Sequence, residues 1–316
     1  MLDPELLLLL KWIISFLSLS SLTAFLLAKL GSKKVSNETL KNLQSRITTW
    51  WMIVAVFIFS TFIGKMGTVV LFATISFFAL REVASLIKTR RSDYSLLVFA
   101  FIAVLPIQYA LVAMKWYGLF AIFIPVFVAS ILAIWKAWSG DNERFFESVA
   151  SVEWCLVLCI YFVSHAPALL MLDLSGSLSE NFKLLWFFTL VVQINDVTQY
   201  IFGKIFGKHG KHPLNKKVSP NKTIEGLLGG LACSTLVGFL LSWLTPFSGG
   251  QAALMALISA VAGTGGGLVL SAIKRDAGVK DYGTILPGHG GMMDRFDSLC
   301  FAAPVFFHLT RYFFAG

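Results

Sequence analysis

The stretch SAIKRDAGVKDYGTILPGHGGMMDRFD, residues 271–297, is a polar segment between two apolar runs and marks a point where the chain leaves an apolar environment. Its four fixed positive charges and four carboxylates are Lys274, Arg275, Lys280, Arg295, Asp276, Asp281, Asp294 and Asp297. Carboxylate oxygens are the hard ligands that Mg²⁺ prefers, and neighbouring cations offset the charge of phosphate groups. The segment therefore predicts polyphosphate chemistry at the edge of an apolar region.

The rest of the chain has the composition of an integral membrane protein. Of its 316 residues 57% are hydrophobic and only 14% are charged, and the mean hydropathy is +0.76. A soluble domain carries roughly 25% charged residues, so this class is excluded. Apolar runs near the length of a membrane helix recur along the chain, and we predict an all-α, polytopic protein with about ten transmembrane helices. The predicted spans are residues 5–29, 48–64, 66–80, 95–113, 117–135, 148–171, 184–202, 224–246, 250–273 and 299–315.

The distribution of Lys and Arg predicts the orientation of these spans. Most of the 26 basic residues fall in the loops that follow odd-numbered spans, whereas the opposite loops contain only Lys65, Lys115 and Lys183. Cytoplasmic loops of membrane proteins are enriched in Lys and Arg. We therefore expect both termini to face away from the cytoplasm, and the polar loops to face the cytoplasm from what we take to be a bacterial inner membrane.

The chain divides by composition into two regions. Residues 1–175 resemble generic membrane helices, about six in number, whereas residues 176–316 combine about four spans with polar cytoplasmic loops and form the catalytic-type region. The net charge of +9 lies in short loops beside spans, where topology and anionic lipid headgroups explain it, so no nucleic-acid partner is expected. The four cysteines lie in or beside apolar runs without metal-like spacing, which predicts packing roles.

The seventh predicted span carries an unusual set of polar residues, namely Gln193, Asn195, Asp196 and Gln199. Interhelical hydrogen bonds would account for the amides. A carboxylate at that depth needs a cation, a proton or a water-filled cavity, so we interpret Asp196 as a functional residue and a candidate metal ligand. Glu153 and His165 in the sixth span are interpreted as satisfied residues of the helix bundle.

The next loop, KHGKHPLNKKVSPNKTIEGLLGG at residues 208–230, is interpreted as a basic hinge that ends in a helix start. Ser219 is the predicted N-cap and Pro220 the first helical residue, which places Lys222 and Thr223 beside free backbone amides. Such a terminus can bind a phosphate. The open alternative is a capped juxtamembrane helix whose lysines only set topology. The glycines at 226, 229 and 230 would let another helix approach closely.

The run from Pro287 to Gly291 can expose successive backbone amides as an anion-binding nest, which would include Gly288 and Gly290. Asp294 and Asp297 are three residues apart and share a face if a helix has begun there. The glycines, cations and carboxylates together favour a phosphate site over a solvated loop.

These residues resemble, in order and spacing, the signature of the CDP-diacylglycerol synthase (phosphatidate cytidylyltransferase) family. The matching residues are Ser271, Lys274, Arg275, Lys280, Asp281, Gly283, Pro287, His289, Gly290, Gly291, Asp294, Arg295 and Asp297. An upstream block of Ser219, Pro220, Lys222, Thr223, Glu225 and Gly226, together with Asp196 and Tyr200, is also similar to that family. The resemblance covers roughly residues 185–316, and the first half is similar only in being hydrophobic.

The resemblance implies that the protein converts CTP and phosphatidate into CDP-diacylglycerol and pyrophosphate. Mg²⁺ is the implied cofactor, and whether a monovalent cation is also needed is left open. It implies charge-neutralising roles for Lys222, Lys274, Arg275 and Arg295, and it adds His289 to the catalytic candidates. The implied metal ligands are Asp294, with Asp297, Asp281 and Asp196 as further ligands. The implied substrate-binding residues are Ser219, Thr223, Ser271, Lys280, Gly288, Gly290 and Gly291. CTP, phosphatidate and membrane lipids are thus the expected partners, and a homodimer would suit helices with exposed small-residue faces.

One position departs from the family pattern. Four residues before Ser271 the family typically has an acidic residue, but the run GTGGGLVLS places Gly267 there. The loss of an anionic ligand predicts weaker Mg²⁺ binding and reduced turnover. Two alternatives stay open: a non-catalytic membrane paralogue that binds lipid phosphates or scaffolds partners, and a CTP-dependent kinase of a lipid alcohol, in which His289 would have to activate a hydroxyl.

Overall fold

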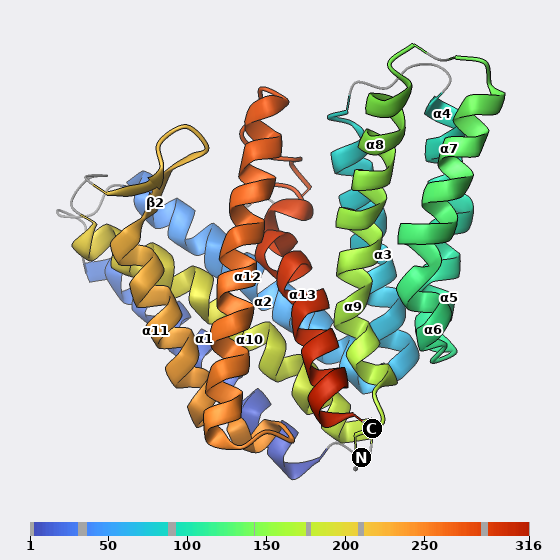
Figure 1. The fold of residues 1–316 in the computed structure, drawn as a ribbon. Coiled ribbons are helices and arrows are strands. Elements are labelled where there is room, and N and C mark those ends of the chain that lie inside the picture. The colour runs from blue at the N-terminus through green and yellow to red at the C-terminus, as the bar shows by residue number, and fades with distance from the viewer. Residues whose placement is uncertain are drawn as a thin grey trace.

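The computed structural model describes residues 3–30, 37–87, 93–141, 143–174, 178–207, 212–285 and 290–315. These residues form a helical bundle with one small hairpin (Figure 1). The helices of the first part are α1 (Pro4–Leu30), α2 (Asn37–Ile63), α3 (Lys65–Ala84), α4 (Tyr94–Phe99), α5 (Leu105–Ala113), α6 (Tyr117–Ile122), α7 (Ala129–Trp138), α8 (Phe145–Leu156) and α9 (Val163–Ala168). The second part contains α10 (Leu178–Phe206), β1 (Pro213–Asn215), β2 (Ser219–Thr223), α11 (Ile224–Leu240), α12 (Gly249–Asp276) and α13 (Met293–Phe314).

Short π-helical segments at Ala100–Val104, Phe123–Val128 and Val157–Phe162 join α4 to α5, α6 to α7 and α8 to α9 into three long helical rods. Each of the ten apolar runs picked from the sequence falls within helical structure, apart from end residues and the turn after α11. The helix assignment of the sequence is therefore confirmed in type and approximate position.

In the described residues, six helices are long and apolar enough to cross a membrane. They span Pro4–Leu26, Lys65–Ala84, Tyr94–Ala113, Tyr117–Trp138, Phe145–Met171 and Gly249–Asp276. Two shorter apolar helices cover Ile47–Ile63 and Ile224–Leu240. Helices α10 and α13 carry charged side chains within their length, among them Asp196 and Asp297, and are not among the six. The chain is an all-α membrane protein, but the predicted count of about ten spans is not confirmed.

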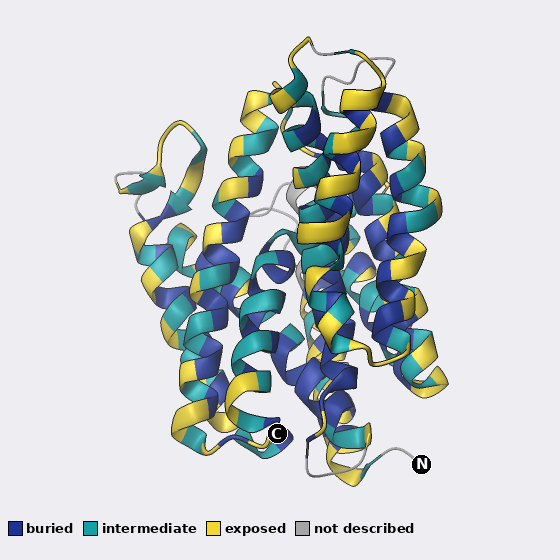
Figure 2. Cartoon of the chain, turned by 45° about the vertical axis from the view of Figure 1, so that its right-hand side comes forward, coloured by how far each residue is buried: buried dark blue, intermediate teal, exposed yellow. Residues whose placement is uncertain are grey.

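The burial pattern suits a protein whose outer faces contact lipid. Many of the helices carry a buried face and an exposed face (Figure 2), whereas α9 is buried throughout. Large apolar side chains are exposed on the outside, with Phe16 at 68%, Phe59 at 66% and Ile102 at 74% exposure. In water such surfaces would favour association, whereas in a bilayer they match the solvent.

Both termini lie at the same end of the bundle (Figure 1). Lys183 near the start of α10 fixes the N-terminus there, because its ammonium lies 2.6 Å from Glu5, 3.4 Å from Asp3 and 2.7 Å from Glu180. The Lys183 side chain is only 4% exposed. Three carboxylates thus compensate one buried cation and tie the first helix to the second half of the chain.

Glycines bring α10, α11 and α12 close together; the sequence predicted such an approach at Gly226, Gly229 and Gly230, but not at Gly238. A Cβ at Gly226 would lie 2.6 Å from the backbone O of Gln199, and one at Gly230 would lie 2.8 Å from Oδ1 of Asn195. On the other side, a Cβ at Gly238 would lie 2.4 Å from Cβ of Ala256. Small residues let helix backbones approach within membrane bundles. Helix α13 then packs between this group and the rods of the first half (Figure 1).

Candidate functional site

Polar residues from four elements meet where α12 ends and α13 begins. Asp196 comes from the middle of α10, Lys222 from the end of β2, Lys274 from the last turn of α12, and Asp297 from the first turns of α13. The α12–α13 connection reverses the chain, and α10 and the hairpin pack against α12. Residues far apart in sequence therefore share one site, as the contact between Ser298 and Asp196 across 102 positions illustrates.

Asp294 ties three segments of this region together. Its Oδ1 accepts a hydrogen bond from Nζ of Lys274 at 2.7 Å, and its Oδ2 accepts the N–H groups of Tyr282 at 2.8 Å and Gly291 at 2.9 Å. The carboxylate side chain is 4% exposed. A buried carboxylate needs such partners, since an unpaired one is costly. Asp294 thus locks the end of α12, the loop and the start of α13 into one arrangement.

Tyr282 reinforces this loop from the other side. Its hydroxyl donates to the backbone O of Leu270 at 2.9 Å, and its ring lies 5.3 Å from Nζ of Lys274. A tyrosine hydroxyl is a protonated donor at neutral pH, and burial raises the pKa of Tyr282 further above that range.

Asp196 and Asp297 face one another from different helices. Ser298 joins them, because its Oγ donates to Oδ1 of Asp196 at 3.0 Å and its N–H donates to Oδ1 of Asp297 at 2.8 Å. The positive charges of Lys222 and Arg295 lie near enough to act on both carboxylates. Ser298 was not singled out by the sequence analysis, since a serine at the start of an apolar run gives no distinct signal.

Lys222 reaches the space beside Gly267. A Cβ placed on Gly267 would lie 2.6 Å from Nζ of Lys222, and 3.7 Å from both Oδ2 of Asp297 and Oγ of Ser298. The ammonium therefore lies in the volume that a side chain at position 267 would enter. A cation stands where the family pattern predicts an acid.

The predicted helix start at Ser219 is wrong. Ser219–Thr223 is strand β2, which pairs with β1 in antiparallel register, Pro213 opposite Thr223 and Asn215 opposite Ser219. Oδ1 of Asn215 accepts the N–H groups of Lys217 and Val218, which reverses the chain before β2.

The true N-cap of α11 is Thr223, whose Oγ1 accepts the N–H of Gly226 at 3.1 Å. Both Ser219-Pro220 and Thr223 carry capping signals, and the turn at Asn215 selects the later one. Lys222 thus projects from a strand, not from a first helical turn, and the hydroxyl of Thr223 serves the cap.

Asp294 and Asp297 both lie in α13, which begins at Met293, so the condition stated for the two residues to share a helix face is met. Gly290 has a positive φ of 80°, which a turn at this point requires of a glycine. The N–H of Gly291 donates to Asp294, and those of Met292 and Met293 donate to the carboxylate of Glu82 on α3. These three amides therefore have protein acceptors and do not form an open phosphate nest. Pro287, Gly288 and His289 lie outside the described residues.

Other predicted site residues lie around this centre. Arg275 is exposed and donates to the backbone O of Val218 at 3.4 Å, which links α12 to the hairpin. Ser271 donates to the backbone O of Gly267 at 2.6 Å within α12. Lys280 and Asp281 are exposed, and Ser219 is half-buried on β2. The structure thus brings together Asp196, Lys222, Lys274, Asp294, Arg295 and Asp297, whereas Lys280 and Asp281 stand at the margin.

The donor set fits an ion that arrives with phosphates. Among the described residues, no three His, Cys, Asp or Glu side chains are arranged to hold a metal by themselves. Asp196 and Asp297 supply two carboxylates in contact with one serine. Mg²⁺ commonly takes one or two carboxylates, with substrate phosphates and water completing its coordination. This pair fits such an ion better than Asp294, whose oxygens already accept three hydrogen bonds.

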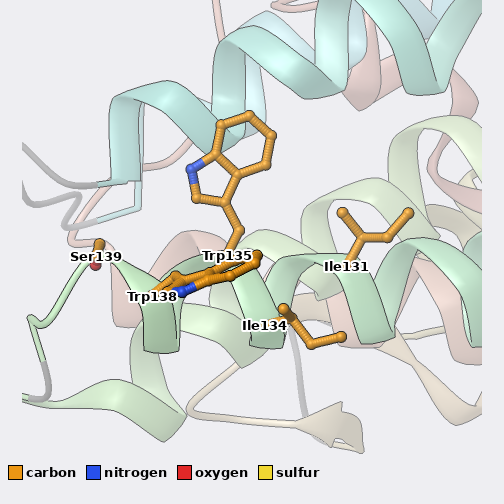
Figure 3. A pocket seen from close by; sticks show the side chains of 5 residues that line it. All are labelled: Ile131, Ile134, Trp135, Trp138 and Ser139. Carbon is orange, nitrogen blue, oxygen red and sulfur yellow. The ribbon is translucent and has the colours of Figure 1, made fainter.

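A separate groove lies on helix α7. A groove of about 400 Å³ runs along α7 and is lined by Ile131, Ile134, Trp135, Trp138 and Ser139 (Figure 3). The Trp135 ring turns toward the neighbouring helix, where its centroid lies 5.5 Å from that of Phe99. Among the described residues, no charged side chain lines this groove, so its described lining does not suit a triphosphate.

A family model described as the cytidylyltransferase family matches residues 44–313. The chain belongs to the cytidylyltransferase family. The match reaches far into the first half, so the expectation that the resemblance was confined to residues 185–316 was too narrow. The whole of helix α3 lies inside the matched region.

Two kinds of relative are similar to this chain. The uncharacterized protein YnbB of Escherichia coli (strain K12) is 38% identical over 289 residues, which cover 91% of this chain and 92% of that protein. A phosphatidate cytidylyltransferase of Staphylococcus haemolyticus is 43% identical over 129 residues, and one of Staphylococcus aureus (strain COL) is 44% identical over the same length. Those matches cover 40% of this chain and 48% of the staphylococcal proteins, about half their length.

Proposed function

We propose that this protein is a phosphatidate cytidylyltransferase, which converts CTP and phosphatidate into CDP-diacylglycerol and pyrophosphate. Membership of the cytidylyltransferase family and the names of the staphylococcal relatives support the proposal. The observation that carries it is the meeting of Lys222, Asp196 and Asp297 beside the Lys274–Asp294 pair, which unites cations and carboxylates at one end of the membrane helices.

In this reaction the protein has mainly to position the two reactants and to neutralise their negative charges. A phosphate oxygen of phosphatidate attacks the α-phosphorus of CTP, the bond to the β-phosphate breaks, and pyrophosphate leaves. The attacking oxygen is already anionic, so the protein needs no serine or cysteine nucleophile. Lys222 and Arg295 beside the carboxylates, and Arg275 at the hairpin, would offset the charges of the two reactants.

Asp196 and Asp297 would hold Mg²⁺, and the ion when bound would neutralise charge on the triphosphate. We assign Asp294 a supporting role, because its contacts hold Lys274 and the first turn of α13. The charge of Lys274 is then largely compensated by Asp294, whereas Lys222 lies beside the carboxylate pair.

We also propose ten spans, with both termini outside and the site facing the cytoplasm of a bacterial cell. The bias of Lys and Arg toward alternate loops supports this orientation. The common end of the two termini supports an even number of crossings (Figure 1). The site then meets cytosolic nucleotide and membrane lipid at once.

The test is an assay of purified protein with phosphatidate, Mg²⁺ and CTP labelled on its α-phosphorus, beside the variants Gly267→Asp and Asp294→Ala. We expect weak transfer of label to lipid by the unmodified protein, faster transfer by Gly267→Asp and none by Asp294→Ala. A carboxylate at 267 would join Asp297 in attracting Mg²⁺, and the Lys222 ammonium can move aside because it ends a flexible side chain.

Gly265→Ala is the matched control, because a Cβ there meets nothing within 4 Å. Full activity of the unmodified protein with no gain from Gly267→Asp would refute the role given to position 267. Comparable turnover by Asp294→Ala would refute the role given to Asp294.

A second candidate function is binding of lipid phosphates without turnover. The ammonium of Lys222 in the space beside Gly267 favours it, because a cation there takes the place of an anionic ligand. Saturable binding of CTP or phosphatidate without labelled product would support this function. Transfer of label from the γ-phosphorus of CTP to a lipid alcohol would instead identify a kinase.

A further inference from the structure

A carboxylate from the first half of the chain reaches the α12–α13 junction. Glu82, in the last turn of α3, is 5% exposed. Its Oε1 accepts the N–H of Met292 at 2.8 Å, and its Oε2 accepts the N–H of Met293 at 2.9 Å, across more than 200 positions of sequence. Both oxygens of one buried side chain thus accept hydrogen bonds from backbone amides at the start of α13.

Those two amides are ones that the helix cannot satisfy itself. The first N–H groups of a helix lack a preceding turn to accept them. Met292 is the N-cap residue of α13, and its side chain makes no capping hydrogen bond. The negative charge of Glu82 also meets the positive end of the helix dipole, which stabilises it. Glu82 therefore supplies from α3 the cap that the local sequence of α13 lacks.

Two glycines make room for this carboxylate. A Cβ at Gly283 would lie 2.7 Å from Oε1 of Glu82, and a Cβ at Gly291 would lie 2.5 Å from Oε2. Real Cβ atoms do not approach oxygens so closely, so any other residue would push the carboxylate away. These glycines do not need unusual backbone angles, since neither has a positive φ. Because these glycines have no side chain, the Glu82 carboxylate can lie close to the backbone at both positions.

The cap is continuous with the proposed reaction centre. The N–H of Gly291, one residue before the two capped amides, donates to Asp294, and Asp294 accepts from Lys274. One turn further along α13, Asp297 faces Asp196 through Ser298. A shift in the first turn of α13 would move both aspartates relative to α10 and α12.

We propose that Glu82 is a positioning residue for cytidylyl transfer, which fixes the first turn of α13 and thereby the placing of Asp294 and Asp297. The inference rests on the proposed function for its activity readout only. It gives α3 a part in the site, and it assigns Gly283 and Gly291 to the seating of a protein carboxylate.

The test compares full-length Glu82→Gln with unmodified protein by hydrogen exchange over residues 290–297 and by steady-state kinetics. Gln offers one acceptor and turns an NH₂ group toward the second amide. We expect exchange in this segment to rise by about 10- to 100-fold, the range for loss of a hydrogen bond to a charged group. We expect kcat to fall by about 100-fold with KM for CTP changed less than about threefold, because misplacement by about 1 Å has that effect on chemistry.

Glu153→Gln is the matched control, because Glu153 is a carboxylate of the same half that lies on α8. Exchange over 290–297 and both kinetic constants should equal those of unmodified protein. Glu82→Asp keeps the charge but shortens the reach, and we expect it to restore part of both the protection and the kcat.

Gly283→Ala provides a second route if Glu82→Gln folds poorly. It leaves the carboxylate in the chain but crowds Oε1, so it should raise exchange over 290–297 as well. When Gly283→Ala is combined with Glu82→Ala, it should raise exchange over 290–297 little beyond the effect of Glu82→Ala alone, because the carboxylate oxygens with which the methyl group would collide are absent.

Exchange over 290–297 that is unchanged in both Glu82→Gln and Gly283→Ala overturns the inference. So does a rise in exchange with an unchanged kcat in an active protein. If the unmodified protein transfers no label, the proposed function fails, whereas the exchange result still decides whether Glu82 fixes α13.

Discussion

Lys222 and Gly267 form a pair that neither residue explains alone. A glycine at 267 leaves a gap in α12, and the Lys222 ammonium fills it beside Asp297 and Ser298. Two carboxylates that face each other repel unless a cation lies near them. Lys222 supplies that cation from the protein, which lowers the attraction of the Asp196–Asp297 pair for a divalent ion.

Lys222→Gln should therefore bind Mg²⁺ more tightly while folding less stably. Without Mg²⁺ we expect the free energy of unfolding to fall by about 1–2 kcal/mol. This is less than the roughly 3–5 kcal/mol expected for breaking a fully buried ion pair, because these groups are half-buried. Added Mg²⁺ should then raise the melting temperature more than it does in unmodified protein. Thermal unfolding in detergent across a Mg²⁺ series measures both effects.

Lys280→Gln is the control for this change, because Lys280 is exposed at the margin of the site. It removes one positive charge without touching the two carboxylates, so its response to Mg²⁺ should match that of unmodified protein. An equal Mg²⁺ response in Lys222→Gln would show that Lys222 does not compete with the ion.

At the scale of elements, the glycine face of α11 decides how closely the helices of the second half pack. The backbone O of Gln199 on α10 would lie 2.6 Å from a Cβ at Gly226. A backbone atom within a helix cannot move alone, so a methyl group there would push α10 and α11 apart. Since α10 carries Asp196 and α11 follows Lys222, the separation would also widen the site.

Gly226→Ala should thus destabilise the protein by about 1–3 kcal/mol, the usual range for overpacking. The matched change Gly265→Ala lies in α12 with nothing within 4 Å, and it should stabilise the protein by about 0.5–1 kcal/mol through helix propensity. If this packing is correct, thermal unfolding will show a lower melting temperature for Gly226→Ala and a higher one for Gly265→Ala than for the unmodified protein. A stabilising Gly226→Ala would contradict the close approach of α10 and α11.

The hairpin is the element that sequence patterns described least well. Ser219 and Pro220 have the residue types of a helix start, yet they form β2 because Asn215 turns the chain and Thr223 caps α11. Capping preferences are local and worth about 1 kcal/mol, so a competing turn can override them.

At the scale of the whole molecule, the two halves defined by composition share one site. Glu82 of α3 caps α13, and Lys183 of α10 holds Asp3 and Glu5 of the N-terminus. The division at residue 175 therefore describes composition rather than independence of the first half.

The proposed orientation predicts opposite labelling of two exposed positions. Lys216 lies in the turn of the hairpin, and Asp173 lies in the connection that precedes α10. In cells, Lys216→Cys should react with a membrane-impermeant maleimide only after the membrane is opened, whereas Asp173→Cys should react in intact cells. Cys155, Cys159 and Cys300 are buried, and the unmodified protein serves as the background for Cys233. Labelling of Lys216→Cys in intact cells would contradict the proposed orientation and indicate the opposite one.

The sequence alone was sufficient for the helical membrane class, the approximate position of the helices and the family. These features depend on local composition and on spacing within short segments, because apolar runs must form helices in a bilayer and the signature residues lie within 27 positions. It also identified most of the polar residues that meet at the site, including Asp196, Lys222 and Asp294.

Only the tertiary structure decided what each of these residues contacts. The cap from Glu82 on Met293, the Ser298 link between Asp196 and Asp297, and the place of Lys222 beside Gly267 all join segments that are distant in sequence. Such contacts arise when helix faces pack, and the same residue types would satisfy the local patterns in many packings. Glu82 next to Arg81 resembles an ordinary loop charge in sequence, and it becomes a cap only because α3 packs where α13 begins.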